Sequence, residues 1–323
     1  MGRGWRSAPR GRTLAAVTSF LVPVGRVKGS RATRLARRLQ AYVALTKPRI
    51  IELLLVTTVP AMVLARRGLP SGWLVLATVA GGALSAGGAN AYNMVADRDI
   101  DRVMDRTKDR PLVTGAVRPR AAFVFATALE GIAFAELWLA VNLLSAVLAL
   151  AAAAFYVFVY TLWLKRSTAR NIVIGGAAGA VPALVGWAAV TGTIGWPAVV
   201  LFGVVFLWTP PHFWALAVRY RDDYKAAQVP MLPAVASLKR TSGQIVLYTI
   251  ALWVVSLLLV PVAHMGFVYE IAALALGAGF LAMALRLRRD QTDRAAMRLF
   301  GFSITYLTVL FAAVAADVLV RYH

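Results

Sequence analysis

The chain has 323 residues, of which 60% are hydrophobic and only 15% are charged, which is too few charges to cover the surface of a soluble domain of this length. A net charge of +21 would suit nucleic acid, but Lys and Arg are confined to the N-terminus and to the breaks between apolar blocks, so a duplex finds no continuous basic stripe. Cysteine is absent and the three histidines are far apart in sequence, which excludes disulfides and argues against a zinc site.

Residues 1–40 form a basic arm that we expect to be disordered. Ten Lys or Arg residues precede residue 40, and the first acidic residue is Glu52. A mitochondrial transit peptide has this composition, and so does a basic arm that lies against anionic lipid in a bacterium. The composition of the whole chain, rich in Arg, Ala and Val, favours the bacterial cell membrane over the mitochondrial inner membrane.

We expect residues 41–323 to form one all-α integral membrane domain. Long apolar blocks alternate with charged or Gly/Pro breaks, and each crossing of the hydrocarbon needs about 20 mainly apolar residues in a helix. The nine candidate spans are roughly 50–65, 73–95, 121–138, 143–164, 171–190, 196–218, 243–263, 267–285 and 299–319.

The connections between these spans alternate in charge. Those at 97–120, 165–170, 219–242 and 286–298 contain Lys or Arg, whereas the breaks near 139–142, 191–195 and 264–266 contain neither. Positively charged loops stay in the cytoplasm, so we predict a cytoplasmic N-terminus, with Arg66 and Arg67 as the exception on the outer side. All the loops rich in ionisable groups then face the same aqueous compartment.

The most informative polar residues lie at the end of the second predicted span. Asn90, Asn93, Asp97, Asp101 and Asp105 are spaced by three, four, four and four residues, so on a helix they share one face. Carboxylates beside hydrocarbon are costly and usually mark a site, and Mg²⁺ prefers oxygen ligands of this kind together with substrate phosphate. We therefore predict a Mg²⁺ site at Asn93, Asp97 and Asp101. Asp105 better fits the alternative, a solvated helix end with ion pairs.

Cations suited to a phosphate occur in the same loop and at the ends of other spans. Lys108 and Arg110 follow the acidic residues, and metal and Lys/Arg together neutralise a diphosphate leaving group. At the other span ends, headgroup anchoring is the ordinary role, and contact with substrate phosphate is the alternative if the helices converge. The residues concerned are Lys47, Arg49, Tyr160, Lys165 and Arg166.

Two later segments contain polar residues that admit two interpretations. His212 follows adjacent prolines inside a span, where it either contacts a buried substrate or is a packing residue whose polar atoms are satisfied. Asp222 and Asp223 follow that span. One of them would face the first cluster across the bundle and complete a second metal position, or Asp223 pairs with Arg219 on a short interfacial helix.

These motifs together resemble the UbiA superfamily of intramembrane prenyltransferases, and within it the members that farnesylate heme. The family's first aspartate motif, N-x-x-x-D-x-x-x-D, is matched by Asn93, Asp97 and Asp101. Further matches are the continuation to Leu112 and the segments 160–166, 171–176, 208–214 and 229–233.

The resemblance extends from about Tyr42 to the C-terminus, with one departure. Many relatives have a second D-x-x-x-D motif, where this chain has the adjacent pair Asp222-Asp223. The heme-type pattern favours Asp223, because the recurrent aspartate directly precedes tyrosine. The missing spacing leaves open whether one or two Mg²⁺ ions bind.

The resemblance implies a bundle of nine helices around a central cavity. It also implies transfer of a farnesyl group from farnesyl diphosphate to the vinyl group of heme B, with hydration, to give heme O. The implied ligands of Mg²⁺ are Asn93, Asp97 and Asp101, with Asp223 opposite, and Asp97, Asp101 and Asp223 are the implied catalytic residues. The cations implied to neutralise the diphosphate are Lys47, Arg49, Lys108, Arg110, Lys165 and Arg166. The candidate acceptor contacts are His212 and Tyr160.

The implied partners are farnesyl diphosphate, heme B and membrane lipid, without nucleic acid, together with a downstream heme A synthase or the assembly of a terminal oxidase. Two alternatives remain at this point. One is a prenyltransferase of the same superfamily that uses an aromatic or quinone-precursor acceptor. The other is a transporter, which predicts inward-facing polar residues at the bilayer midplane and often inverted repeats. The ionisable residues gather at one face instead.

Overall fold

The structure is a computed structural model that describes residues 31–322, with the side chains of residues 35–48 and 56–322. Most of the predicted basic arm therefore lies outside the described residues. All regular structure in the described part is helical, as predicted. The chain divides into two compact units, one ending at Arg37 and the other comprising Arg38–His323, and the site described below lies within the second.

Within the described residues, eight helices are long and apolar enough to cross a membrane. Two helices precede these eight in the chain, α1 (Arg31–Thr46) and α2 (Arg49–Arg66). Three short helices lie in the connections, α4 (Arg98–Val103), α10 (Arg221–Ala226) and α11 (Leu232–Val235). The eight are α3 (Gly72–Ala96), α5 (Pro119–Ala140), the continuous run of α6 (Leu143–Ala154), η1 (Phe155–Leu164) and α7 (Lys165–Ser167), α8 (Asn171–Thr191), α9 (Trp196–Arg219), α12 (Leu238–Ala263), α13 (Phe267–Asp290) and α14 (Asp293–Tyr322).

The nine predicted spans correspond to these eight helices and to α2. The apolar stretch of α2 within the part of the chain searched is Val56–Arg66, which is shorter than a full crossing. A ninth crossing therefore stays a prediction, as does the cytoplasmic N-terminus. Several helices are longer than their predicted spans. For example, α12 begins at Leu238 because the Ser237 hydroxyl accepts a hydrogen bond from the Arg240 amide at 3.2 Å and caps the helix.

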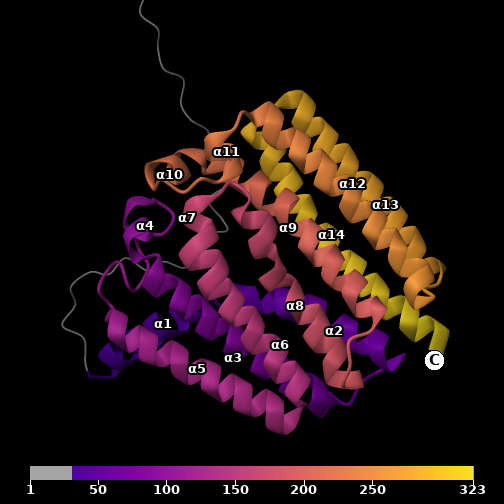
Figure 1. Cartoon of the computed structure of the whole chain (residues 1–323), viewed down its shortest axis with the longest axis horizontal. Helices are drawn as coiled ribbons and strands as arrows, with labels where there is room; N and C mark the ends of the chain where they lie inside the picture. Colours follow the sequence, from indigo (N-terminus) through magenta and orange to yellow (C-terminus); the bar gives the residue numbers. More distant parts are fainter. Residues whose placement is uncertain (1–30, 323) are drawn as a thin grey trace, which may run out of the picture. The chain divides into compact units, whose positions relative to one another are not determined.

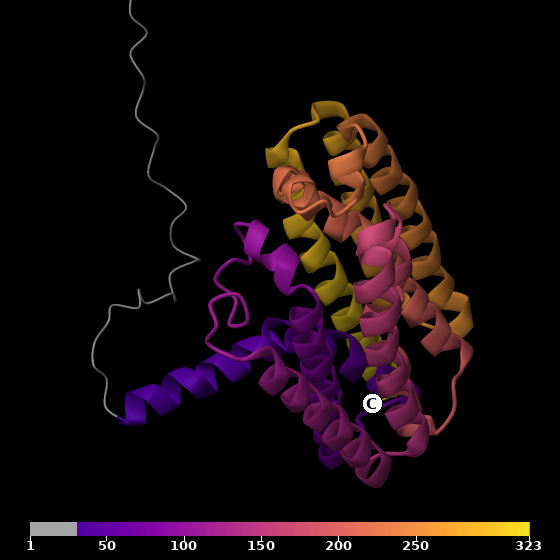
Figure 2. The same ribbon diagram turned by 60° about the vertical axis from the view of Figure 1, so that its left-hand side comes forward.

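The helices of the second unit pack into two connected groups. In the first group α3 packs against α5 and α6, and in the second α9 packs against α12 and α14, with α13 contacting both α12 and α14. Helix α8 joins the groups because it contacts α6, α9 and α2. Figure 1 shows this arrangement, and Figure 2 shows α12 and α13 side by side in orange.

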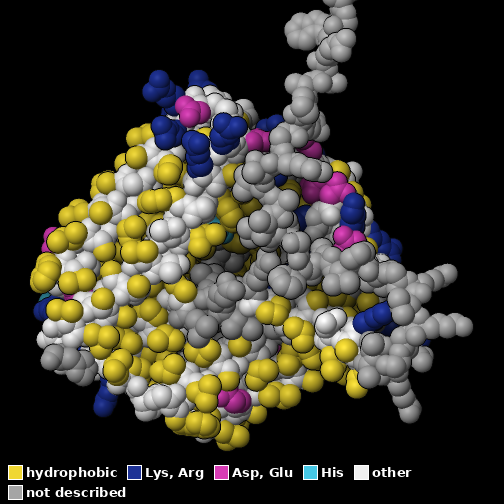
Figure 3. Space-filling view, turned by 180° about the vertical axis from the view of Figure 1, so that it is seen from behind, with side chains coloured by type: hydrophobic (Ala, Val, Ile, Leu, Met, Phe, Trp, Pro, Cys, Tyr) yellow, Lys and Arg dark blue, Asp and Glu magenta, His cyan; other side chains and the backbone are white. Residues whose placement is uncertain are grey.

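The outer surface matches a lipid environment. Large hydrophobic side chains are exposed along the long helices, among them Leu139 at 82% and Trp196 at 76%. In Figure 3 hydrophobic side chains are spread over the left and lower parts of the visible face, whereas Lys and Arg side chains gather at its upper end and on the right. Soluble monomeric proteins rarely expose such a large apolar surface to water, so these helices are membrane-spanning.

A glycine allows α2 and α8 to approach closely. A Cβ placed on Gly186 of α8 would lie 2.4 Å from the Thr58 carbonyl oxygen of α2, and a backbone atom cannot move away as a side chain can. We therefore expect Gly186→Ala to lower the melting temperature of the purified protein in detergent, since forcing atoms into a packed interface costs about 1–3 kcal/mol. Gly301→Ala is the matched control, because nothing lies within 4 Å of its added Cβ. An unchanged melting temperature for Gly186→Ala would contradict this account of the contact.

Candidate active site

The predicted acidic column spans the junction between α3 and α4. Asn93 is 3% exposed, Asp97 0% and Asp101 2%. The helical bonding continues through the junction, because the Asp97 amide donates to the Asn93 carbonyl at 2.9 Å and the Asp101 amide to the Asp97 carbonyl at 2.8 Å. Bonds of this i to i−4 pattern keep residues four apart on one face. The three side chains are thus aligned and buried together.

Asp105 does not continue the column. Met104 has extended backbone angles and ends α4, so the next residue leaves the helical face. The Asp105 carboxylate is exposed and pairs with the Lys108 ammonium at 2.8 Å. This pair holds the pKa of Asp105 below its usual range, first through the hydrogen bond from Lys108. Asp105 and Lys108 therefore belong to the solvated loop, and the structure does not bring Lys108 to the column.

Each buried side chain of the column contacts a cation from another segment. Lys165, at the end of the η1 segment, forms an ion pair with Asp97. Arg110 contacts both Asp101 oxygens through Nη1, at 2.8 and 2.7 Å. The Lys47 ammonium donates to Asn93 Oδ1 at 3.0 Å. Lys47, Arg110 and Lys165, whose sequence positions are far apart, thus converge on one site.

The crowding of cations also affects Lys47 itself. Its pKa is lowered to about 7, first because its ammonium is desolvated and then because the charges of Arg110 and Lys165 are close. An added anion would relieve this repulsion. The site therefore has the positive charge that favours a phosphate, although carboxylates lie next to the cations.

Arg166, another predicted phosphate contact, does not line the cavity described next. Arg166 forms a two-pronged ion pair with Asp99, both distances being 2.8 Å, and its Nη2 donates to the Ala96 carbonyl at 3.0 Å. The hydrogen bond from Arg166 is the largest cause of the strongly lowered pKa of Asp99. Arg166 thus joins the η1–α7 end to the α3–α4 junction. The side chain of Arg49 lies outside the described residues.

A cavity of about 430 Å³ opens beside the column. Lys47, Asn93, Asp101, Arg110 and Lys165 lie at its polar end, and the rest of the wall is mostly apolar. This combination suits a substrate with a charged head and a hydrocarbon tail. The apolar wall is formed by residues of α3, α6, η1, α8 and α9, including Val79, Ala86, Ala152, Val185 and Trp208.

Two aromatic residues of η1 line this cavity side by side. Tyr156 and Tyr160 have nearly parallel rings with centroids 5.4 Å apart. Tyr160 was predicted as a candidate contact, whereas Tyr156 was not, because an aromatic residue in an apolar span gives no separate signal. Arg106 was also missed as a cavity residue, since its sequence position marks only a basic loop.

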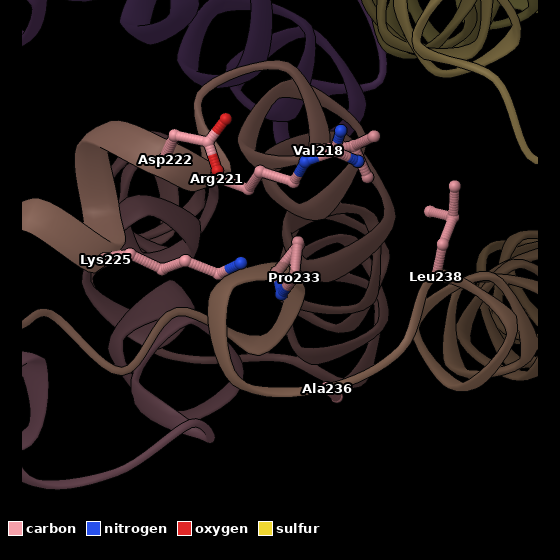
Figure 4. Close-up of a pocket in the computed structure, with 7 residues that line it drawn as sticks. All are labelled: Val218, Arg221, Asp222, Lys225, Pro233, Ala236 and Leu238. Atoms are coloured by element: carbon pink, nitrogen blue, oxygen red, sulfur yellow. The ribbon is translucent and has the colours of Figure 1, made fainter.

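The second predicted acidic cluster lies on α10, whose residues reach two pockets. Tyr224 lines the central cavity together with Met231, which precedes α11. Asp222 instead lines a separate pocket of about 430 Å³ with Arg221 and Lys225, and the Lys225 side chain extends toward Pro233 in Figure 4. Asp223 is half-buried and lines neither of these two pockets. The two adjacent aspartates are therefore not equivalent, and Asp222 belongs to the outer pocket.

His212 packs against α14 and does not line the cavity. Its Nδ1 is 2.7 Å from the Ser303 hydroxyl of α14, and its ring lies against Trp208 and Phe300 at centroid distances of 4.2 and 4.6 Å. Trp208 lines the cavity but His212 does not. The structure thus places His212 as a packing residue with a satisfied hydrogen bond, and it does not bring His212 to the candidate substrate space.

The donor atoms of the column fit Mg²⁺. Among the described residues no group of three or more His, Cys, Asp or Glu gathers, so the candidate set is two carboxylates and one amide oxygen. Asp97 Oδ1 is buried and finds no hydrogen-bond partner among those residues. Mg²⁺ ordinarily takes one or two carboxylates and completes its octahedron with water and substrate phosphate, which is the composition that this site and a diphosphate would provide.

An all-helical membrane domain with buried carboxylates and converging cations at one end of an apolar cavity defines an integral membrane enzyme for phosphorylated lipidic substrates. The model of the UbiA prenyltransferase family matches residues 54–312, so the chain belongs to that family.

Curated relatives match almost the whole chain. It is 56% identical to a protoheme IX farnesyltransferase of Renibacterium salmoninarum over 287 residues, which cover 87% of this chain and 90% of the relative. It is 60% identical to protoheme IX farnesyltransferase 1 of Saccharopolyspora erythraea over 282 residues, which cover 86% and 90%.

Solved structures support the fold. A digeranylgeranylglyceryl phosphate synthase superposes with a TM-score of 0.73 at 17% identity, covering 87% of this chain and 98% of the other. A UbiA homologue from Archaeoglobus fulgidus, bound to GPP and Mg²⁺, superposes with a TM-score of 0.58 at 17% identity, covering 85% and 99%. The predicted membrane prenyltransferase fold is confirmed.

Proposed function

We propose that this protein transfers a farnesyl group from farnesyl diphosphate to the vinyl group of heme B, with hydration, to give heme O and diphosphate. The observation that carries the proposal is the identity of 56% over 287 residues and of 60% over 282 residues with two relatives named protoheme IX farnesyltransferase. The cavity supports it, because a polar end with cations and the Asp101 carboxylate is joined to an apolar space that suits a farnesyl chain.

We assign Asn93, Asp97 and Asp101 as the residues that would hold Mg²⁺. When bound, the ion would polarise the diphosphate and neutralise charge on the leaving group. The donor set supports this assignment, as does Asp97 Oδ1, which is buried, has no hydrogen-bond partner among the described residues and lies 3.8 Å from Arg166 Nη2. Asp223 as an opposite ligand stays a prediction, since the residue is half-buried and Tyr224 rather than Asp223 lines the cavity.

Lys47, Arg110 and Lys165 would bind the diphosphate oxygens as the bond between farnesyl C1 and oxygen breaks. The electron pair of that bond leaves with the diphosphate, and the three cations stabilise the charge that develops there. The apolar wall keeps water from the allylic cation until the vinyl carbon bonds to C1. Water then adds its oxygen to the porphyrin-side cation and loses a proton. Lys108, Arg166 and Arg49 stay predicted contacts outside this set.

The setting of the reaction follows from the same family. We propose that the protein is a multi-pass protein of a bacterial cell membrane, with residues 41–323 as the catalytic domain and residues 1–40 as a basic arm at the lipid surface. Acceptor contacts by Tyr160 and His212 stay predictions, and the position of Tyr160 on the cavity wall favours it over His212. Contact with a heme A synthase or with terminal oxidase assembly also stays a prediction.

The test is to express the chain in a bacterium that lacks heme O and to analyse the extracted hemes by mass spectrometry. We expect a heme with a farnesylhydroxyethyl group, and the membrane fraction is probed for the protein in parallel. Protein in the membrane without this heme would contradict the proposal. A prenylated aromatic acid or quinone precursor in the same extract would instead identify the other acceptor class.

A further inference from the structure

The amide of Asn93 has only one orientation that satisfies its neighbours. The Asp97 carboxylate can only accept hydrogen bonds, and it lies 2.7 Å from Asn93 Nδ2. The Lys47 ammonium can only donate, and it lies 3.0 Å from Asn93 Oδ1. A flipped amide would set oxygen against carboxylate and NH₂ against ammonium. Oδ1 therefore faces Lys47, and both residues line the cavity. A metal ligand needs its oxygen turned away from the carboxylate in this manner.

A third neighbour, Thr161 of η1, completes this arrangement. Its hydroxyl lies 3.1 Å from Asn93 Nδ2 and donates its own proton to the Tyr156 carbonyl at 2.8 Å. With its proton committed to that carbonyl, the Thr161 oxygen can only accept from Asn93. Thr161 is 0% exposed, so water does not compete for these bonds.

The backbone of η1 explains why Thr161 reaches this position. Residues Phe155–Leu164 form a π-helix, in which each backbone amide bonds the carbonyl five residues earlier. Such segments are rare in proteins, and those that occur are often found at functional sites. The hydroxyl of Thr161 bonds the carbonyl five positions earlier, and Tyr160 and Lys165, also five apart, both line the cavity. A regular α-helix would turn positions five apart to different faces.

We propose that Thr161 is a positioning residue for the metal–diphosphate site. Its hydroxyl holds the Asn93 amide so that Oδ1 points at the substrate head, although Thr161 itself touches neither metal nor diphosphate. The inference rests on the proposed Mg²⁺ and diphosphate site, but not on heme as the acceptor. Partners of metal ligands in other proteins typically contribute 10- to 100-fold to metal affinity or activity.

The test measures metal binding without turnover. Mn²⁺ binding to the purified full chain is followed by electron paramagnetic resonance in the presence of farnesyl S-thiolodiphosphate, an analogue that does not ionise. Thr161→Val removes the hydroxyl and keeps the shape, and we expect it to raise the Mn²⁺ concentration for half-saturation about 10-fold. Thr161→Ser restores the hydroxyl and should bind within about threefold of wild type.

The matched control is Thr249→Val. Thr249 is equally buried and donates to a carbonyl of its own helix, Ile245, at 2.8 Å, but it lies on α12 away from the cavity lining. It should bind Mn²⁺ as wild type does. If Thr161→Val does not accumulate, Thr161→Ala compared with Thr161→Ser tests the same hydroxyl.

The outcomes separate the two proposals. Wild-type Mn²⁺ affinity in Thr161→Val, or equal weakening in Thr161→Ser, would overturn the positioning role. Absence of Mn²⁺ binding in the wild-type protein would overturn the metal site and the role of Thr161 together. If Mn²⁺ binding responds to the hydroxyl as expected while no farnesylated heme forms in cells, only the acceptor assignment fails.

Discussion

Asp97→Asn is expected to reduce farnesyl transfer by about 100-fold or more while the protein still inserts into the membrane. Asp97 is fully buried, one of its oxygens pairs with Lys165 and accepts from Asn93, and the other oxygen lacks a hydrogen-bond partner among the described residues. Asparagine is similar in shape but lacks the charge that a metal and a lysine require. Mass analysis of heme O in cells expressing the variant measures the loss.

Asp105→Asn is the matched control for this experiment. It removes the same charge four residues beyond Asp101, but Asp105 is exposed and pairs only with Lys108 at the surface. Exposed ion pairs are screened by solvent and contribute little, so heme O production should stay close to that of the wild type. Near-normal product from Asp97→Asn would show that the column is a salt-bridged helix end and not a metal site.

Lys165→Met is the second substitution with a large expected effect. Lys165 lines the cavity and neutralises Asp97 in the free enzyme, and we infer that it contacts the diphosphate during the reaction. Its loss removes stabilisation of the leaving group, so kcat/KM for farnesyl diphosphate should fall by about 100-fold. Steady-state assays with purified protein in nanodiscs measure this change.

Two further variants show whether the effect of Lys165→Met is due to the lost charge and whether it is specific to this position. Lys165→Arg keeps the charge and should recover part of the activity, whereas Lys239→Met removes an exposed lysine at the start of α12 and should change little. Equal loss in Lys165→Arg and Lys165→Met would mean that the shape of the lysine, and not its charge, is what the site requires. Unchanged kinetics for Lys165→Met would remove Lys165 from the proposed site.

The acidic column could be predicted because its geometry is local. Residues four apart share a helical face, and the bonds across the α3–α4 junction keep this relation even though the Asp97 backbone leaves ideal helical angles. Asp105 could likewise be separated from the column by its distance from the span. The helical class and the positions of the long helices were also readable from apolar blocks.

The family resemblance implied a common role for these cations, but composition and spacing alone could not predict their convergence, because it depends on how distant segments pack. Lys47 and Lys165 reach Asn93 and Asp97 over sequence separations of 46 and 68 residues. Periodicity in an apolar span also does not say which side faces a cavity. His212 and Trp208 lie one turn apart on α9, yet Trp208 lines the cavity and His212 bonds Ser303.

The π-helical backbone of η1 could not be predicted from the sequence either. Phe155–Leu164 reads as an ordinary apolar helix, since the choice between bonds to the fourth and the fifth preceding residue leaves no compositional mark. The role of Thr161 depends on this choice. From the sequence alone, the Thr161 hydroxyl would be interpreted as a polar group that bonds a carbonyl within its own helix.

The pairing of each acid in the column with its own cation makes substrate binding an exchange of partners. Asp97 and Asp101 already form ion pairs with Lys165 and Arg110. A divalent cation that binds alone would have to displace both of these side chains and leave them without counter-ions. A diphosphate arriving with the metal accepts the released cations while the metal takes the carboxylates. Metal and diphosphate should therefore each raise the affinity for the other, and in the free enzyme both acids stay paired with their cations until both have arrived.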